Sequence, residues 1–401
     1  MKWYQQRHNR NRGMAELHSS NMASPRSSWT DRVAAWLLPF HPVSAVFSVV
    51  LLSTRGKQVI QGIRTQHSDM YVWGLLGVLG WISVLIGVDL GRGALNWLVP
   101  FIFIWIYALG RWSVQEPEKF FRDLLRATGL LACVVVIARL LQLEVSLGGL
   151  VLLDHFGPGG RGYVIGQGAN GLAVVLEVGA VGGLTLLLLG GQARERFEGA
   201  VIGMVSLAAV IVTLSRGAIV GIGGAALMGA VLVNWQYVVW VPAGLLFAAA
   251  ISPTASNRLL SILDLSRNIQ RLRIWEGSLK LLKDHLWFGV GPGNFGLVYP
   301  RYRLPEEYEQ VRTPHNVYLY FASGWGLLGS LIFFGWIGWV MFRNLRRELE
   351  AYEKAIFLVL IAFWIHVLFD DLITAQVPLL LGILDRHQTS SHLTSASDSQ
   401  T

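Results

Sequence analysis

The sequence predicts an all-α protein, a polytopic bundle of about 10–12 membrane segments with a long extracytoplasmic loop that contains an amphipathic helix. Hydrophobic residues make up 53% of the 401 residues, and the mean hydropathy is +0.47. Charged residues make up only 14%, whereas soluble proteins have about 25%. The apolar residues form blocks of about 16 to 25, and about 20 apolar residues suffice for a helix to cross the hydrocarbon core of a bilayer. These observations exclude a disordered chain and an ordinary soluble enzyme.

The residue types fit the same class of protein. The 16 Trp and 11 Tyr residues are typical of helix ends at the lipid headgroups, and the 44 Gly residues favour close packing of helices within lipid. Cys133 is the only cysteine, so an intramolecular disulfide and a cysteine-based metal site are excluded. The net charge of +8 arises from loops beside apolar spans, where membrane lipids explain it, and we expect no nucleic-acid partner.

The chain is expected to have three regions. Residues 1–32 form a basic tail that lacks the layout of a cleaved signal peptide, so we expect it to be disordered. Residues 33–384 form the membrane domain, and residues 385–401 form a polar C-terminal tail. The spans expected within the membrane domain are 33–52, 71–88, 94–110, 124–143, 170–190, 199–215, 217–234, 237–252, 316–342 and 355–374, followed by a shorter apolar run at 376–384.

Alternate short loops differ in their content of Lys and Arg, and cytoplasmic loops carry the excess. One set of loops has only Arg92, Arg161 and Arg216. The other set has thirteen basic residues, namely Arg55, Lys57, Arg64, Arg111, Lys119, Arg122, Arg126, Arg194, Arg196, Arg343, Arg346, Arg347 and Lys354. The richer set is therefore expected to face the cytoplasm, which places the 63-residue loop 253–315 outside.

The first expected span conflicts with this orientation, because a single crossing at 33–52 would place the basic tail outside. Pro39 and Pro42 lie in the first half of this segment, and proline removes helical hydrogen bonds. We therefore expect a break in the helix, with a re-entrant or surface-lying hairpin that returns the tail to the cytoplasm.

The outer loop is expected to contain an amphipathic helix that lies along the outer membrane surface or caps the bundle. Its apolar residues recur at intervals of three and four, at Ile269, Leu272, Trp275, Leu279, Leu282 and Leu286. The glycine-rich stretch 289–295 follows this helix rather than a strand, so we expect a tight turn and not a dinucleotide-binding loop. A nest of backbone N–H groups for a phosphate is the alternative.

Two residues at the outer boundary of the membrane are candidates for chemistry. His315 is held between Pro314 and the span that begins at Asn316, where a helix cap or a headgroup contact is the alternative to a functional role. Arg216 lies where two apolar runs meet with almost no loop. Because ionisable groups within spans usually face a polar cavity, we favour that position over snorkelling to the headgroups. A guanidinium there can bind a phosphate or diphosphate through paired hydrogen bonds.

Three acidic residues also lie in expected spans. Glu177 is expected to face the interior of the bundle. Asp370 and Asp371 lie near the outer end of the span 355–374, where they could bind a cation, a substrate or an arginine. A structural ion pair is an equal alternative for each of the three.

The residues from about 170 to 370 resemble the O-antigen ligase and polymerase family. The resemblance rests on three pieces, and their order and spacing are more specific than any one of them. The pieces are Ser215-Arg-Gly217; Arg271-Leu-Arg-Ile-Trp275 with Gly289-Val-Gly-Pro-Gly-Asn-Phe295; and Pro314-His-Asn-Val-Tyr-Leu319 with Gly324-Trp-Gly-Leu-Leu-Gly329.

The resemblance implies a membrane glycosyltransferase that acts on glycans carried by undecaprenyl diphosphate, on the outer face of the bacterial inner membrane. It implies an inverting transfer that needs no metal, no cofactor and no nucleotide sugar. The diphosphate contacts carry over onto Arg216 and Arg271, with Arg273 as the alternative to Arg271, and activation of the acceptor hydroxyl carries over onto His315. General chemistry agrees, because fixed guanidinium groups stabilise a leaving diphosphate and histidine is a base near neutral pH.

The acceptor stays open at this point. A ligase, a polymerase and a protein-glycosylating relative differ only in whether a lipid-borne glycan, a growing polysaccharide or a protein receives the sugar. An anion transporter for a bicarbonate-like ion is the alternative from another class, since a basic cavity with Arg216 could pass an anion. The long outer loop and the lack of an inverted repeat favour the enzyme, and a requirement for His315 distinguishes the two.

Overall fold

The computed structural model describes residues 25–40, 42–65, 67–147, 150–154, 160–164, 167–233, 235–236, 238–239, 268–305, 307 and 311–386. Nearly all of the expected span at 237–252, the first part of the outer loop and the greater part of both polar tails lie outside these residues.

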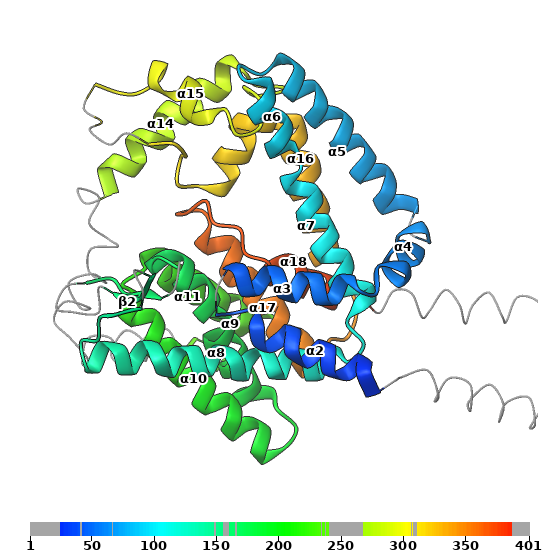
Figure 1. The fold of residues 1–401 in the computed structure, drawn as a ribbon, viewed down its shortest axis with the longest axis vertical. Helices are drawn as coiled ribbons and strands as arrows, with labels where there is room; N and C mark the ends of the chain where they lie inside the picture. Colours follow the sequence, from blue (N-terminus) through cyan, green and yellow to red (C-terminus); the bar gives the residue numbers. More distant parts are fainter. Residues whose placement is uncertain are drawn as a thin grey trace, which may run out of the picture.

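The described secondary structure is almost entirely helical (Figure 1). The helices are α2 (Pro25–Leu37), α3 (Pro42–Ser53), α4 (Gly56–Arg64), α5 (His67–Ile86), α6 (Leu90–Trp97), α7 (Val99–Ala108), the π-helix η1 (Leu109–Ser113), α8 (Pro117–Leu140), α9 (Ala169–Leu189), α10 (Ala193–Thr213), α11 (Arg216–Leu232), α14 (Ile269–Asp284), α15 (Phe295–Val298), the 3-10 helix η3 (Tyr299–Arg301), α16 (Val317–Leu345), α17 (Ala351–His366) and α18 (Gln376–Leu384). Three short strands, β1 (Val145–Leu147), β2 (Leu150–Asp154) and β3 (Tyr163–Val164), form an antiparallel sheet between α8 and α9, where the sequence predicted only a loop.

The structure confirms the predicted class, an all-α polytopic membrane protein. In the described part of the chain, five helices are long and apolar enough to cross a bilayer: α5, the continuous helix Leu90–Ser113, α9, α10 and α16. Helices α3 and α4 give a sixth candidate if the pair, bent by 71°, counts as one broken span. The count is lower than expected because α11, α17 and α18 have only 17, 16 and 9 residues, and because α8 carries charged residues in its first half.

The helices form two groups that are joined through α17 and α18 (Figure 1). Helices α5, α6, α7 and α16 make up one group, and α8, α9, α10 and α11 make up the other. Helix α17 packs on α9 and α11, and α18 packs on α17, α7 and η1. Helix α9 is the most enclosed of the candidate spans, with 78% of its apolar window buried. Its first residues, Ala169 and Asn170, are only partly buried and line the larger cavity described below.

Glycines allow α9 and α10 to pack closely. A side chain on Gly183 would place its Cβ 2.5 Å from the backbone nitrogen of Gly203, and one on Gly199 would come within 2.7 Å of the Gly183 carbonyl oxygen. These distances are below any van der Waals contact, so only glycine permits the approach. The glycine-mediated helix packing expected from the composition is present at this contact.

The expected break in the first apolar segment is present, so residues 33–52 are not one simple span. Helix α2 ends at Leu37 and α3 begins at Pro42. The Ser44 hydroxyl donates to the Leu37 carbonyl at 2.6 Å, and the Ser48 hydroxyl donates to the Ala34 carbonyl at 2.9 Å. These contacts make α2 and α3 an antiparallel hairpin. Helix α2 begins at residue 25, so the last residues of the stretch expected to be a disordered tail, 25–32, are helical.

The loops expected to face the cytoplasm lie together. Arg55, after α3, donates at 2.6 Å to both Asp31 of α2 and the carbonyl oxygen of Ser113. Arg122 of α8 forms an ion pair with Glu195 at the start of α10. The hairpin therefore places the start of α2 beside these basic loops, on the side where the sequence predicted the basic tail.

The amphipathic helix expected in the outer loop is present as α14, but it packs through a different face. Ile274 and Leu281 are buried against Tyr299 of the following segment. Leu272 and Leu279, which belong to the predicted apolar stripe, are 40% and 54% exposed. Trp275 of the stripe is partly buried and packs on Phe369, whereas the main contact with the rest of the loop uses the other face. Small residues on that other face allow a close approach that hydrophobic spacing does not reveal.

A buried hydrogen bond strengthens the segment beneath α14. The Tyr299 hydroxyl donates to the Glu307 carboxylate at 2.6 Å. Burial, followed by the hydrogen bond to Glu307, raises the pKa of Tyr299. The phenol therefore stays protonated and remains a donor at neutral pH.

The outer loop is attached to a kink in α16. Gly326 has a φ of +70° inside this helix, and a Cβ there would lie 2.2 Å from the carbonyl oxygen of Trp287. The freed backbone groups bind the loop: Leu327 N donates to Leu286 O at 2.7 Å, and Val290 N donates to Ser323 O at 2.8 Å. Gly289, Gly291 and Gly293 all have positive φ, so the glycine-rich stretch is the tight turn that the sequence predicted.

A buried charge network on the basic side joins α18 to the group that contains α5, α7 and α16. Arg111 is fully buried, forms an ion pair with Asp385 and donates to the Tyr107 hydroxyl at 2.7 Å. Arg343 of α16 also pairs with Asp385, and Asp69 of α5 lies 3.4 Å from Arg111. The network thus connects α5, α7, η1, α16 and the end of α18.

We expect Asp385→Ala to destabilise the protein strongly, by about 3–5 kcal/mol, because it leaves two buried guanidinium groups without their main partner. Thermal unfolding of the purified protein in detergent measures the loss. Glu116→Ala is the matched control, since Glu116 pairs with Lys119 at the surface, where the two side chains are 39% and 69% exposed, and such pairs contribute less than about 1 kcal/mol. Equal unfolding temperatures for the two variants would contradict this account.

We expect Gly326→Ala to destabilise by more than about 1 kcal/mol, because alanine is strained at positive φ and its Cβ would clash with the Trp287 carbonyl. Hydrogen exchange should show faster exchange of the amides of Val290 and Leu327. Gly335→Ala in the same helix is the control, because a Cβ there meets no atom within 4 Å and alanine favours a helix. A Gly326→Ala protein as stable as the control would show that the kink is not needed.

Candidate functional site

Arg216 is fixed at a tight junction between two helices. Helix α10 ends at Thr213 and α11 begins at Arg216 itself. Leu214 takes the left-handed conformation, with φ +55°, and Ser215 is extended. Only two residues therefore separate the helices, so the position of Arg216 is set by both of them. This is the geometry that the meeting of two apolar runs predicted.

Arg216 and Arg271 line the same small cavity, of about 40 Å³. Arg271 comes from the first turn of α14 and Arg216 from the first turn of α11. Within the described residues, no carboxylate forms an ion pair with Arg271. The full lining consists of Arg161, Asn170, Leu214, Ser215, Arg216, Gly217, Arg271, His366, Phe369 and Asp370. The cavity is thus rich in cationic groups.

The structure distinguishes Arg271 from Arg273. Arg273 is not among the residues that line the cavity. Two residues along an α-helix turn the side chain by about 200°, so the two arginines of α14 point in nearly opposite directions. The sequence left both open because it did not define which face of the helix meets the bundle.

Two helix N-termini also open at this place. Ser215 precedes α11 and Gly168 precedes α9, and neither helix has a side-chain cap hydrogen bond. Ser215 lines the small cavity, and Gly168 lines a larger one beside it. The first N–H groups of a helix and its dipole favour an anion. The backbone therefore adds to the positive potential of the arginines.

Asp370 lines the arginine cavity and is held in place by hydrogen bonds to neighbouring residues. The side chain is only 5% exposed and accepts a hydrogen bond from the Asn170 amide. Asn170 in turn accepts from Arg161 at 2.8 Å, and Asp370 accepts from the backbone nitrogen of Asp371 at 2.9 Å. This chain of polar groups holds the carboxylate in one orientation.

His315 is held in place from both sides. The Pro314 carbonyl accepts a hydrogen bond from the indole nitrogen of Trp275 at 3.0 Å. Asn316 caps α16 by accepting from the backbone nitrogen of Leu319 at 3.0 Å. His315 itself has a φ of +50°, which is uncommon for a residue other than glycine. The ring is partly exposed, so it combines a fixed backbone with access from outside.

The structure brings His315 next to the two aspartates. One ligand atom each from His315, Asp370 and Asp371 lies within 4.8 Å of the others. The backbone explains the proximity, because Val317 N donates to Val367 O at 3.0 Å and so joins α16 to the segment after α17. Three such groups could hold a cation. They also form the arrangement in which a carboxylate orients an imidazole as a base.

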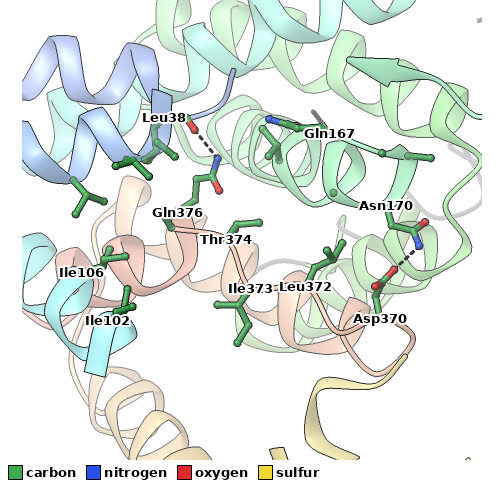
Figure 2. A pocket seen from close by; sticks show the side chains of 18 of the residues that line it. Leu38, Ile102, Ile106, Gln167, Asn170, Asp370, Leu372, Ile373, Thr374 and Gln376 are labelled. Atoms are coloured by element: carbon green, nitrogen blue, oxygen red, sulfur yellow. Dashed lines mark hydrogen bonds between the residues drawn. The ribbon is translucent and has the colours of Figure 1, made fainter. Parts of the chain in front are cut away.

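A larger cavity of about 760 Å³ continues from Asp370 and Asn170. Figure 2 shows this polar pair at one end of the cavity and Ile102 and Ile106 of α7 at the other. The side chains in between are mainly apolar and come from α3, α7 and the segment 372–376. Asp370, Asn170 and Arg161 line both cavities. An amphiphile with an anionic head and an apolar tail fits this combination.

The sequence missed some residues of the site. It predicted that Glu177 faces the bundle interior, and Glu177 is indeed buried, 2.8 Å from His366. His366, Asn170 and Arg161 were not singled out. His366 and Asn170 lie near the outer ends of expected spans and Arg161 lies in an outer loop, but polar residues at such places are also common without a functional role.

Comparison with known proteins gives one match. Residues 201–334 match the family model described as O-Antigen ligase, which confirms the resemblance drawn from the sequence. The matched region includes the α10–α11 junction with Arg216, helix α14 with Arg271, and His315. No curated protein matches the chain.

Proposed function

We propose that this chain is a membrane glycan ligase or polymerase that transfers glycan from an undecaprenyl-diphosphate-linked donor to an acceptor hydroxyl, a proposal that the match of residues 201–334 to the family model described as O-Antigen ligase supports. We propose further that the transfer is inverting and metal-independent, and that the site faces the periplasm or the cell exterior from a bacterial inner membrane. The observation that carries the proposal is the meeting of Arg216 and Arg271 in one cavity whose wall includes Asp370, the neighbour of His315.

The donor diphosphate would bind at Arg216 and Arg271. Two guanidinium groups and the open N-terminus of α11 supply fixed positive charge. A diphosphate that leaves the sugar gains negative charge, and fixed donors in a partly dry site stabilise that charge more than water does. The apolar part of the larger cavity, with Ile102 and Ile106, would take the first isoprenoid units of the carrier lipid.

His315 would act as the general base. The acceptor hydroxyl gives its proton to the imidazole as its oxygen attacks the anomeric carbon. The bond between that carbon and the diphosphate oxygen breaks on the opposite face, so the configuration inverts, and the diphosphate leaves with the bonding electron pair. Asp370 and Asp371 lie close enough to orient the ring and to stabilise the imidazolium that forms.

The acceptor sets the difference between ligase, polymerase and protein glycosylation. The partly exposed position of His315 allows an acceptor to approach from outside the membrane. A lipid-borne glycan, a growing polysaccharide or a protein hydroxyl would use the same base. Identification of the acceptor therefore depends on a direct assay with each class.

We expect His315→Ala to lower the transfer rate by about 100- to 10,000-fold, the usual contribution of a general base. Arg216→Ala should also lower it, by loss of diphosphate binding. The assay incubates purified protein with an undecaprenyl-diphosphate oligosaccharide and a panel of acceptors, and measures product masses. His285→Ala is the control, because His285 is exposed at the end of α14.

Two outcomes of this assay would contradict the proposal. Transfer that EDTA abolishes and Mg²⁺ restores would show that His315, Asp370 and Asp371 hold a cation, against the metal-independent mechanism. The second outcome is that no donor is consumed, while proteoliposomes with either the wild-type protein or the His315→Ala variant take up labelled bicarbonate. The protein would then be an anion transporter and not an enzyme.

We expect Arg271→Ala to raise the KM for the lipid-linked donor by about ten- to one-hundredfold, the usual effect of removing a charged hydrogen-bond donor. Arg273→Ala should leave the KM within about twofold, because Arg273 does not line the cavity. The pair is a matched control, since both arginines belong to the same turns of α14. A larger effect of Arg273→Ala would mean that α14 presents its other face to the donor.

A further inference from the structure

Glu177 and His366 form an isolated buried pair beneath the arginine cavity. His366 Nδ1 lies 2.8 Å from a carboxylate oxygen of Glu177, and each side chain is 1% exposed. Within the described residues, neither carboxylate oxygen of Glu177 accepts a hydrogen bond. His366, when its ring is protonated, can therefore supply the counter-charge of this carboxylate. A carboxylate without one is costly at this depth in an apolar bundle.

The other nitrogen of the His366 ring faces the site. Nε2 lies 3.5 Å from the Ser215 hydroxyl, and His366 lines the same cavity as Arg216 and Arg271. The ring thus has Glu177 on one side and the anion-binding cavity on the other. A ring that is protonated on both nitrogens would present an N–H donor to that cavity.

Helix α11 is shaped to admit this pair. A Cβ on Gly217 would lie 2.4 Å from His366 Cδ2 and 2.8 Å from Nε2. A Cβ on Gly221, one turn later, would lie 3.3 Å from a Glu177 carboxylate oxygen. Only glycine at position 217, directly after Arg216, leaves room for His366 under the first turn of α11.

We propose that His366 is a third cationic ligand of the diphosphate and that Glu177 is the positioning residue that keeps it protonated. Glu177 lies on the buried side of the ring and so favours its protonated form, whereas Arg271, which lines the same cavity as His366, opposes it. This inference rests on the proposed function, because it names a further group for the same diphosphate.

Binding of inorganic diphosphate to the purified full-length protein tests the inference without any need for turnover. Isothermal titration in detergent, with a chelator present, compares wild type with Glu177→Gln, His366→Gln and the double variant. We expect each single variant to bind roughly tenfold more weakly, the effect of losing one charge-assisted hydrogen bond. A single variant leaves one buried polar group without its partner, so we expect it to unfold at a lower temperature than wild type. The double variant replaces both members of the pair by amides, so we expect it to unfold at the wild-type temperature and still to bind diphosphate weakly.

A double variant that unfolds like wild type and binds diphosphate like wild type would overturn the inference, because the pair would then be structural only. If the variants do not fold, nitrogen-15 NMR of histidine-labelled wild type decides. A doubly protonated ring that shifts on addition of diphosphate supports the inference, and the lack of any such ring overturns it.

Arg216→Ala separates the two proposals. If Arg216→Ala weakens binding and His366→Gln does not, only this inference fails. If Arg216→Ala binds as wild type does, the diphosphate site of the proposed function fails.

Discussion

The structure depends on how charged groups are held within an apolar bundle. On the basic side, Arg111 and Arg343 share Asp385 and lie near Asp69. This network has as many carboxylates as guanidinium groups, and it lies between packed helices. A closed and balanced set of this kind joins elements, because removal of any member leaves a buried charge without compensation.

The charges at the opposite end of the molecule are arranged differently. Arg216 and Arg271 face a cavity, and in the described part of the chain Arg271 has no carboxylate partner. Glu177 and His366 lie directly below, and Asp370 is held aside by Asn170. The first network pairs each guanidinium group with a carboxylate, whereas Arg271 has no carboxylate partner among the described residues. That contrast, more than the number of charges, supports the proposal that the cavity binds an anion.

The outer loop contributes through its attachment to the bundle. The kink at Gly326 binds the loop by backbone hydrogen bonds, and Trp275 binds the Pro314 carbonyl. These contacts place Arg271 against α11 and His315 against the segment after α17. The loop is therefore a wall of the site, and its residues act together with residues from distant spans.

The sequence by itself determined the class of the protein and the break at Pro39 and Pro42, and it proposed Arg216 and His315 as candidate site residues. These properties follow from local quantities: the length of apolar runs, the chemistry of proline, and charge placed at a membrane boundary. The glycine-rich stretch 289–295 also predicted a turn. In the structure, three of its glycines adopt positive φ.

Only the tertiary structure decided which face of α14 packs, and therefore that Arg271 and not Arg273 lines the cavity. It also decided that His366 pairs with Glu177 and that Asp370 lies beside His315. The physical reason is the same in each case. Hydrophobic spacing reports how a helix divides between apolar and polar faces, but small residues such as Gly277 and Gly217 control how closely another element can approach. Which distant side chains then meet is set by that packing, which no local pattern contains.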